Sequence, residues 1–404
     1  MALLTKGKCQ SLSDNLMKGK GVFMNGFNFS ENIIRLRREK KITQEQLADF
    51  MGVTKSSVSK WETKQSLPDM LLLPQLASFF DITIDELLGY EPQLGKEQIQ
   101  KIYLDLAGDF AKEPFEKVME QCERMVKQYY SCYPFLYQIC VLLLNHFMLA
   151  EGEVRQKEIL VYGSDLCSRI IENCKDIALC NDAVFLNASI ILQLGNAGEV
   201  IASLEELENP CRLSKQGAGI LLQAYQMTGE MDKANHFAQI SMYQQVIALV
   251  GCATQYLAIH SDNLSICEET LHRITAVAEV YDLEHLHSNV IALFYYQGAI
   301  TYCIHDRKTE ALQLLQKFVY CVEQILQGDV VNLHGDTYFD KLDIWIEQLD
   351  LAGNAPRDKK IICESGMQAL RHPAVAILEK EESYQFMEKQ LAGIYERICN
   401  GLEP

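Results

Sequence analysis

The sequence lacks the features that mark several large classes of protein. It has no apolar run of about 20 residues, the length that a membrane span needs, because Asn145 and His146 interrupt its longest apolar stretch, residues 139–150. No apolar segment follows the N-terminal lysines, so a secretory signal is not indicated. With 48% hydrophobic and 23% charged residues, the composition is that of a globular protein. We therefore expect a cytoplasmic protein without a membrane partner.

Catalytic and metal-binding motifs are also missing. The sequence has no HExxH, P-loop, GxSxG or GxGxxG segment. Its 14 cysteines are scattered, with no CxxC pair and no zinc-finger spacing. These absences predict no enzymatic activity, no metal and no cofactor. The cysteines are expected to be free thiols in a reducing compartment, with a redox sensor as the alternative.

Charge divides the chain into two parts. Residues 1–90 hold 12 basic and 10 acidic side chains, whereas residues 91–404 hold 25 basic and 44 acidic ones. An acidic surface repels nucleic acid. Any contact with DNA is therefore expected within residues 1–90.

Residues 1–28 are predicted to be a flexible or non-native extension. One interpretation of residues 1–23 is a basic arm that reaches DNA. The other is that the natural chain starts at Met24, because codons for residues 20–22 can spell a ribosome-binding site just before it. Under both interpretations the segment lies outside the folded domains.

Five short helices are predicted between residues 29 and 90. The first is expected to start at a helix-capping Ser30 and to end near Lys41. The second opens at Thr43, with Gln46 completing a capping box, and ends at Gly52. The remaining three are expected at residues 55–62 with Thr54 as the cap, after Pro68 with Pro74 in the first turn, and at residues 84–88 before Gly89.

The second and third of these helices have the spacing of a helix-turn-helix. Ala48 is small enough for the third helix to cross the second, and Gly52 allows the left-handed backbone of the turn. Val58 and Trp61 are expected to anchor the third helix in the core. Its opposite face is then free to enter a major groove.

Several short segments in register resemble the XRE, or phage repressor/Cro-type, regulators. They are TQEQLA at residues 43–48, GVT at 52–54, VSKWE at 58–62 and DELLG at 85–89. The resemblance implies a lambda-repressor-like DNA-binding domain at residues 29–90. It further implies a transcriptional regulator that binds double-stranded DNA as a homodimer.

The resemblance also assigns roles to individual residues. Lys55, Ser56 and Lys60 would read base edges in the major groove. Arg37 and Glu62 would form a structural ion pair. Contacts with DNA phosphates are expected from Thr43 and Gln44 at a helix N-terminus, and from Thr54, Ser57 and Ser59.

One residue departs from the pattern of the family. Related proteins usually have glycine three residues after the tryptophan, where this chain has Lys64. If the backbone there has a positive φ, lysine is an uncommon choice. Either the loop is reshaped, or Lys64 is recruited to a DNA phosphate.

Residues 91–404 are predicted to be an acidic, entirely helical effector or dimerisation domain, which makes the whole chain all-α. Apolar residues recur at helical spacing, with breaks at glycines such as Gly251. Leu194-Gly195 and Thr228-Gly229 lie 34 residues apart, the period of tetratricopeptide repeats. This spacing favours a tetratricopeptide-like α-solenoid, with a non-repeating helical bundle as the alternative.

A solenoid of this kind behind an XRE domain resembles the RRNPP regulators. That resemblance implies a peptide or protein effector bound by the helical domain. Aromatic clusters near residues 129–137 and 294–302 either line a groove for it or pack in the core. The alternative functions are a protein-interaction adaptor and an antitoxin-like repressor, in which the solenoid binds a partner protein.

Overall fold

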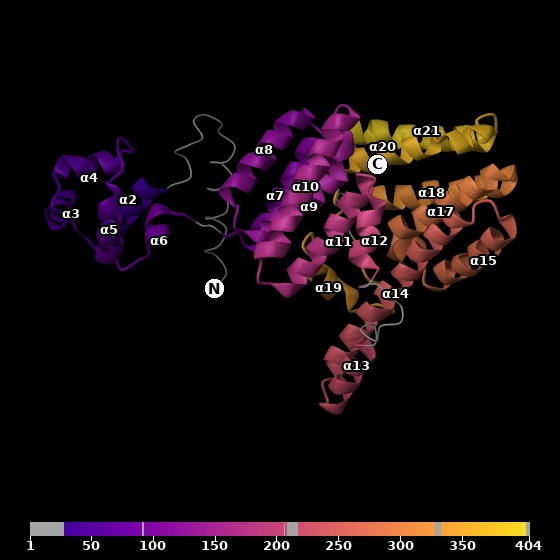
Figure 1. Ribbon diagram of the computed structural model, residues 1–404, viewed down its shortest axis with the longest axis horizontal. Helices are drawn as coiled ribbons and strands as arrows, with labels where there is room; N and C mark the ends of the chain where they lie inside the picture. Colours follow the sequence, from indigo (N-terminus) through magenta and orange to yellow (C-terminus); the bar gives the residue numbers. More distant parts are fainter. Residues whose placement is uncertain (1–27, 91–92, 206, 208–216, 328–332, 401–404) are drawn as a thin grey trace. The chain divides into compact units, whose positions relative to one another are not determined.

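The computed structural model describes residues 28–90, 93–205, 207, 217–327 and 333–400 (Figure 1). The predicted extension, residues 1–28, lies outside this part of the chain except for Asn28. Throughout the described residues the chain is helical, with no β-strand, which confirms the all-α class. Contacts between residues divide the chain into two compact units, residues 1–94 and 95–404.

The N-terminal unit packs short helices around one apolar core. The helices are α2 (Phe29–Glu39), α3 (Gln44–Met51), α4 (Lys55–Glu62), the 3-10 helix η1 (Met70–Leu72), α5 (Leu73–Phe80) and α6 (Ile84–Leu88). Leu47, Val58, Leu76 and Leu87 are fully buried in this core, together with Trp61. The predicted bounds of α4 and α6 are confirmed.

Local capping explains why these helices begin and end where they do. The Thr43 side chain accepts a hydrogen bond from the Gln46 backbone N–H, and the Gln46 side chain accepts one from the Thr43 N–H, which confirms the predicted capping box. Gly52 then ends α3 with a φ of +67°, a conformation that costs glycine little. Thr54 caps α4 in the same manner as Thr43 caps α3.

The prediction for the start of the first helix was wrong. Ser30 is not a cap but lies buried inside α2, which begins at Phe29 with Asn28 before it. The reason is the core, since Phe29 is only 1% exposed. Burying so large an aromatic side chain contributes more free energy than one capping hydrogen bond.

The C-terminal unit consists of helices throughout its described residues. They are α7 (Lys96–Phe110), α8 (Phe115–Gln128), α9 (Tyr133–His146), η2 (Phe147–Leu149), α10 (Glu153–Asn173), α11 (Ile177–Gln193), α12 (Ala197–Leu204), α13 (Gly217–Met227), α14 (Met231–Ile259), α15 (Leu264–Val280), α16 (Leu283–Leu286), α17 (Ser288–Ile304), α18 (Lys308–Leu326), α19 (Leu342–Gln348), α20 (Lys359–Leu370), η4 (Pro373–Leu378) and α21 (Glu382–Cys399). No helix within the described residues is long and apolar enough to cross a membrane.

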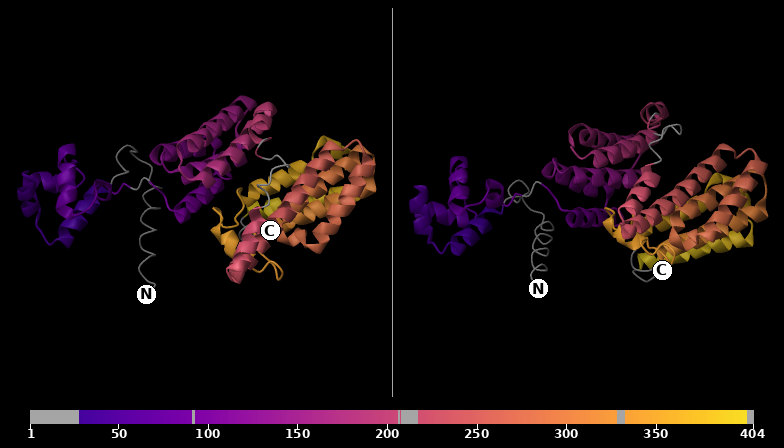
Figure 2. Two further views of the ribbon diagram at one scale, coloured as in Figure 1. Left: turned by 60° about the horizontal axis from the view of Figure 1, so that its bottom comes forward. Right: turned by 90° about the horizontal axis from the view of Figure 1, so that it is seen from below.

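Successive helices of this unit pack as antiparallel hairpins (Figures 1 and 2). Gly195 turns the chain between α11 and α12, and Gly229 turns it between α13 and α14. Both have a positive φ, +85° and +76°. The two glycines of the predicted 34-residue period therefore occupy equivalent places in successive hairpins.

Two further expectations can be compared with the helical unit. The predicted helix break at Gly251 was wrong, because α14 continues through it. Buried Val250 and Leu257 flank that position, so packing outweighs the weak helix propensity of glycine. Phe294 and Tyr295 are fully buried, which places these two aromatics in the core rather than along a groove.

All cysteines within the described residues lie in this helical unit. None of those within the described residues forms a disulfide. Burial raises the pKa of the Cys122 thiol to about 12. A thiol in that state is a poor nucleophile.

We predict opposite effects for two glycine-to-alanine substitutions. In Gly335→Ala the new Cβ would collide with the backbone oxygen of Phe339, so we expect a loss of about 1–3 kcal/mol in the free energy of unfolding. Gly393 lies inside α21 with open space around it, so Gly393→Ala should add about 0.5–1 kcal/mol. Urea denaturation followed by circular dichroism measures both, and equal effects would contradict the packing at Gly335.

Candidate nucleic-acid interface

The third helix of the N-terminal unit, α4, is held by one face and exposed on the other. Val58 and Trp61 are 0% and 3% exposed and pack in the core. Lys55, Ser56 and Lys60 are exposed on the solvent side of the helix. Three predicted base-reading side chains are thus available to a ligand, while the buried face fixes the helix.

The remaining predicted contacts have more varied surroundings. Thr43 and Thr54 are exposed at the N-termini of α3 and α4, but their hydroxyls already cap those helices. Ser57 and Ser59 are half-buried, and the Ser57 hydroxyl lies 2.9 Å from that of Thr54. At these helix starts, backbone N–H groups and the helix dipole favour an anion such as phosphate.

An ion pair connects α2 to the end of α4. Arg37 donates from Nε and Nη2 to the two carboxylate oxygens of Glu62, at 2.6 and 3.1 Å. The two side chains are only 14% and 7% exposed. Arg37 Nη1 also donates to the backbone oxygen of Ile42, at 2.8 Å. The guanidinium thereby ties together α2, α4 and the segment that leads into α3.

Gln44 takes part in this pair, which the sequence did not indicate. Its Nε2 donates to Glu62 Oε2 at 2.8 Å, so the side chain predicted to meet phosphate also braces α3 against α4. Burial alone would raise the pKa of Glu62. The hydrogen bonds from Arg37 and Gln44 outweigh that effect and hold the pKa below its usual value.

Lys64 adopts the left-handed backbone that glycine usually supplies, with a φ of +61°. The Gln65 N–H donates to the Lys60 carbonyl at 2.9 Å, and the Lys64 N–H to that of Trp61 at 3.5 Å, which is the bonding of a Schellman motif. The loop therefore keeps the shape that a glycine would give it. The Lys64 ammonium lies 2.9 Å from Glu31, with both side chains more than half exposed.

The charges around the exposed face of α4 are weakly paired. Lys55 Nζ lies 3.4 Å from Glu45 Oε2, with the two side chains 61% and 66% exposed. Such surface pairs contribute little free energy. DNA phosphates can therefore replace Glu45 and Glu31 as partners of these lysines at small cost.

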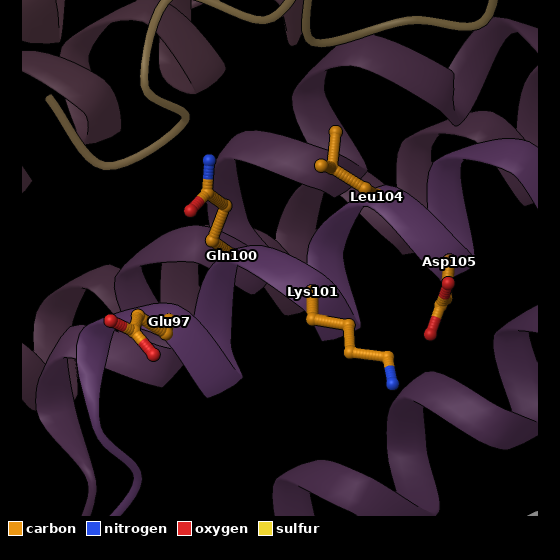
Figure 3. Close-up of a pocket in the computed structure, with 5 residues that line it drawn as sticks. All are labelled: Glu97, Gln100, Lys101, Leu104 and Asp105. Carbon is orange, nitrogen blue, oxygen red and sulfur yellow. The ribbon is translucent and has the colours of Figure 1, made fainter. Parts of the chain in front are cut away.

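A hollow on the C-terminal unit was considered as a second site. It encloses about 360 Å³ and is lined by Glu97, Gln100, Lys101, Leu104 and Asp105 (Figure 3). All five side chains belong to α7. Since a single helix provides no groups that converge on a ligand, we assign no function to this hollow. No group of three metal-ligating side chains occurs within the described residues either.

Comparison with known proteins identifies relatives of the N-terminal unit. Residues 33–87 match the helix-turn-helix family. The chain is similar to the HTH-type transcriptional activator BcrR of Enterococcus faecalis, with 38% identity over 81 residues, which is 19% of this chain and 40% of BcrR. The HTH-type transcriptional regulator YqaE of Bacillus subtilis (strain 168) is 30% identical over 86 residues, 21% of this chain and 69% of YqaE. The match to BcrR thus spans less than half the length of that relative.

Solved structures resemble a larger part of the chain at lower identity. The apo form of the competence regulator ComR from Streptococcus vestibularis aligns with 80% of this chain and 97% of its own. The sequence identity is 13% and the TM-score is 0.21.

The depressed pKa of Glu62 predicts a pH-dependent stability. A carboxyl whose pKa is lowered by folding stabilises the native state fully above its unfolded pKa of about 4.3, and this contribution is lost as the pH falls through the folded value. Glu62→Gln should therefore cost about 1–3 kcal/mol at pH 7, with the difference from wild type shrinking as the pH falls below about 4.3. A Trp345→Phe background leaves Trp61 as the single tryptophan, whose fluorescence follows urea denaturation of this unit.

The matched control for this substitution is Glu39→Gln. Glu39 pairs with Arg35 on the surface, with both side chains more than half exposed. Its removal should cost at most about 0.5 kcal/mol. Equal losses for the two variants, or a Glu62 effect that does not change with pH, would contradict the proposed role of the buried pair.

The left-handed backbone at Lys64 predicts a stabilising substitution. A side chain with a Cβ costs about 1–2 kcal/mol in this conformation, and the exposed pair with Glu31 contributes little. Lys64→Gly should therefore add about 0.5–1 kcal/mol to the free energy of unfolding of this unit, given the greater entropy that glycine loses. Lys60→Gly, inside α4, is the control and should cost about 1 kcal/mol. A loss of stability in Lys64→Gly would contradict the inference that the Lys64 backbone is strained.

Proposed function

Because the chain belongs to the HTH-type transcriptional regulators, we propose that its N-terminal unit binds double-stranded DNA by inserting α4 into the major groove. The observation that carries the proposal is the division of α4 into a buried face, with Val58 and Trp61, and an exposed face with Lys55, Ser56 and Lys60. The protein then acts as a cytoplasmic regulator of transcription.

The proposal assigns two kinds of contact to the interface. Lys55, Ser56 and Lys60 contact base edges, where lysine donates to guanine O6 and N7. The phosphate contacts come from the N-termini of α3 and α4, from Ser59 further along α4 and from Lys64, and they set the position of α4 in the groove. The residues that make these phosphate contacts are Thr43, Gln44, Thr54, Ser57, Ser59 and Lys64.

We further propose that two copies act together on a pseudo-palindromic operator. A single short helix reads only a few base pairs, so regulators of this type usually bind two half-sites about 34 Å apart. The C-terminal unit supplies the dimer contacts or binds an effector, a peptide or a protein. In support, its hairpins resemble those of peptide-binding solenoids, and its net negative charge disfavours DNA as a ligand.

The test is DNA binding by the full chain and by a Lys55→Ala, Lys60→Ala double variant. The probe is DNA from upstream of the protein's own gene, titrated in a gel-shift assay at several salt concentrations. We expect the double variant to bind at least about 30-fold more weakly, since each lysine–base contact contributes on the order of 1–3 kcal/mol.

The matched control removes two lysines from the acidic unit, Lys117 and Lys233. Both are exposed and paired with glutamate, and their double alanine variant should bind DNA as the wild type does. Unchanged binding by the Lys55, Lys60 variant would discard α4 as the reading helix. A protein with no affinity for any DNA, but with a partner protein bound to its helical unit, would favour the adaptor function.

A further inference from the structure

The longest helix of the C-terminal unit, α14, has one face in the core and the other exposed. Its buried face carries Tyr243, Val250 and Leu257, which are 4%, 0% and 0% exposed. The helix packs against α13, α15, α17 and α19 (Figure 1). These contacts fix which side chains of α14 point away from its own unit.

Charged side chains are missing from most of α14. Residues 234–259 contain no Asp, Glu, Lys or Arg, in a chain in which 23% of the residues are charged. The outward face of a helix that stays in water normally carries charged and polar residues. Here Leu249, Tyr256 and Ile259 are 47%, 44% and 72% exposed. An exposed apolar face of this kind is typical of a surface that another molecule covers.

The exposed side chains follow the spacing of a coiled-coil seam. They lie alternately three and four residues apart, which keeps them on one stripe of the helix. We call six exposed residues with this spacing the seam. A stripe of this kind fits a second helix, whose side chains insert between those of the first. The seam consists of Met242, Gln245, Leu249, Cys252, Tyr256 and Ile259.

The seam is complementary to itself when a second copy of α14 runs antiparallel. In a pair centred between residues 250 and 251, a two-fold axis brings each seam residue opposite a different one of the second copy. Every pairing then occurs twice, once on each side of the axis. From the centre outwards, the pairings are Leu249 with Cys252, Gln245 with Tyr256, and Met242 with Ile259.

Each of these pairings joins side chains that suit one another. At the centre, the large Leu249 lies opposite the small Cys252, so the two helices can approach closely. In the next layer, the amide of Gln245 can hydrogen-bond the Tyr256 hydroxyl. The outermost layer buries two large apolar side chains against each other. The order of residues along the seam therefore favours a second copy over an unrelated helix.

The distribution of charge also favours pairing at α14. Residues 91–404 hold 25 basic and 44 acidic side chains, so two copies of this unit repel each other overall. Positions beside a coiled-coil seam usually carry charges that select the partner. Here they are uncharged, and two identical faces meet without repulsion. These positions are Val246, Ala248, Ala253 and Gln255.

We infer that α14 is a dimer interface, which pairs antiparallel with α14 of a second copy through the seam. The role of this pairing in DNA binding rests on the two-copy function proposed above. The interface itself depends only on the outward face of α14. Dimerisation and DNA binding can therefore be measured separately.

The first test is sedimentation velocity of the full chain over a range of concentrations. We expect the wild type to be a dimer at about 10 μM. Leu249→Asp puts an unpaired carboxylate at the centre of the seam and should raise the dissociation constant at least about 100-fold. Leu293→Asp on α17 is the matched control, because Leu293 is 51% exposed and Leu249 is 47% exposed. Its dissociation constant should equal that of the wild type.

Two results of this experiment would overturn the interface. One is a wild type that stays monomeric up to about 100 μM, which would leave the exposed face to another protein. The other is a dimer that Leu249→Asp and Leu293→Asp affect equally.

The second test asks whether the partner of the seam is another copy. One variant carries Leu249→Glu and Cys252→Glu, and the other carries Leu249→Lys and Cys252→Lys. Each should be monomeric alone, because like charges meet in the central layers. When mixed, the two should form one-to-one dimers, since opposite charges then face each other. Native mass spectrometry separates the species by mass, and no association on mixing would overturn the inference.

The third test measures the register by disulfide cross-linking under mild oxidation with copper phenanthroline. A chain with Met242→Cys and Ile259→Cys should form a linked dimer, because these two positions face each other across the pair. Either single variant should not, since the two copies of one position lie about 26 Å apart along the helix. The background replaces the cysteines that are exposed or outside the described residues, namely Cys9→Ser, Cys211→Ser, Cys252→Ser and Cys399→Ser.

The gel-shift assay separates this inference from the function on which its role rests. If the chain dimerises through the seam but binds no DNA, the interface stands and the regulator function fails. If the chain binds DNA through α4 while the double cysteine variant links no better than the single variants, the regulator function stands and the α14 interface fails.

Discussion

The buried ion pair between Arg37 and Glu62 is the constraint on which the candidate interface depends. It connects α2 to α4 through two hydrogen bonds, and Gln44 brings in α3 through a third. A reading helix is useful only if its exposed side chains reach the bases in a fixed orientation. The pair gives little net stability once the desolvation of both charges is counted. Its main contribution is geometric, because it joins α2 to α3 and α4, the two helices proposed to contact DNA.

Most of the N-terminal unit could be predicted because its determinants are local. Thr43, Gly52 and Thr54 set helix ends through bonds to residues at most a few positions away, and such bonds are visible in sequence. Ser30 misled the prediction because burial of Phe29 decided the helix start, and burial is a tertiary effect. For Lys64, the positive φ followed the position in the motif rather than the residue type.

The features that sequence did not reveal depend on contacts between distant residues. Gln44 and Glu62 are 18 positions apart, and Tyr103 and Pro356 are 253 apart. Neither the spacing of apolar residues nor a helix-capping motif reveals such pairs in the sequence. The burial of Gln138 and His146 could not be predicted for the same reason, because both are polar residues in α9 whose burial depends on packing against distant parts of the chain. Composition alone predicts that any DNA contact is confined to residues 1–90, because charge is counted without knowing the fold.

The separation of charge restricts how a ligand of the helical unit can affect DNA binding. An effector changes an equilibrium only by the difference between its affinities for the two states. Because the helical unit is acidic and repels DNA phosphates, an effector bound there would, under the proposed function, act through the DNA-binding unit rather than through a DNA contact of its own. Within the helical unit, Lys96 and Lys360 link α7, which begins this unit, to α19 and α20 near its end. Under the proposed function, an effector that changes how these distant helices are held together would give its binding free energy a structural element on which to act.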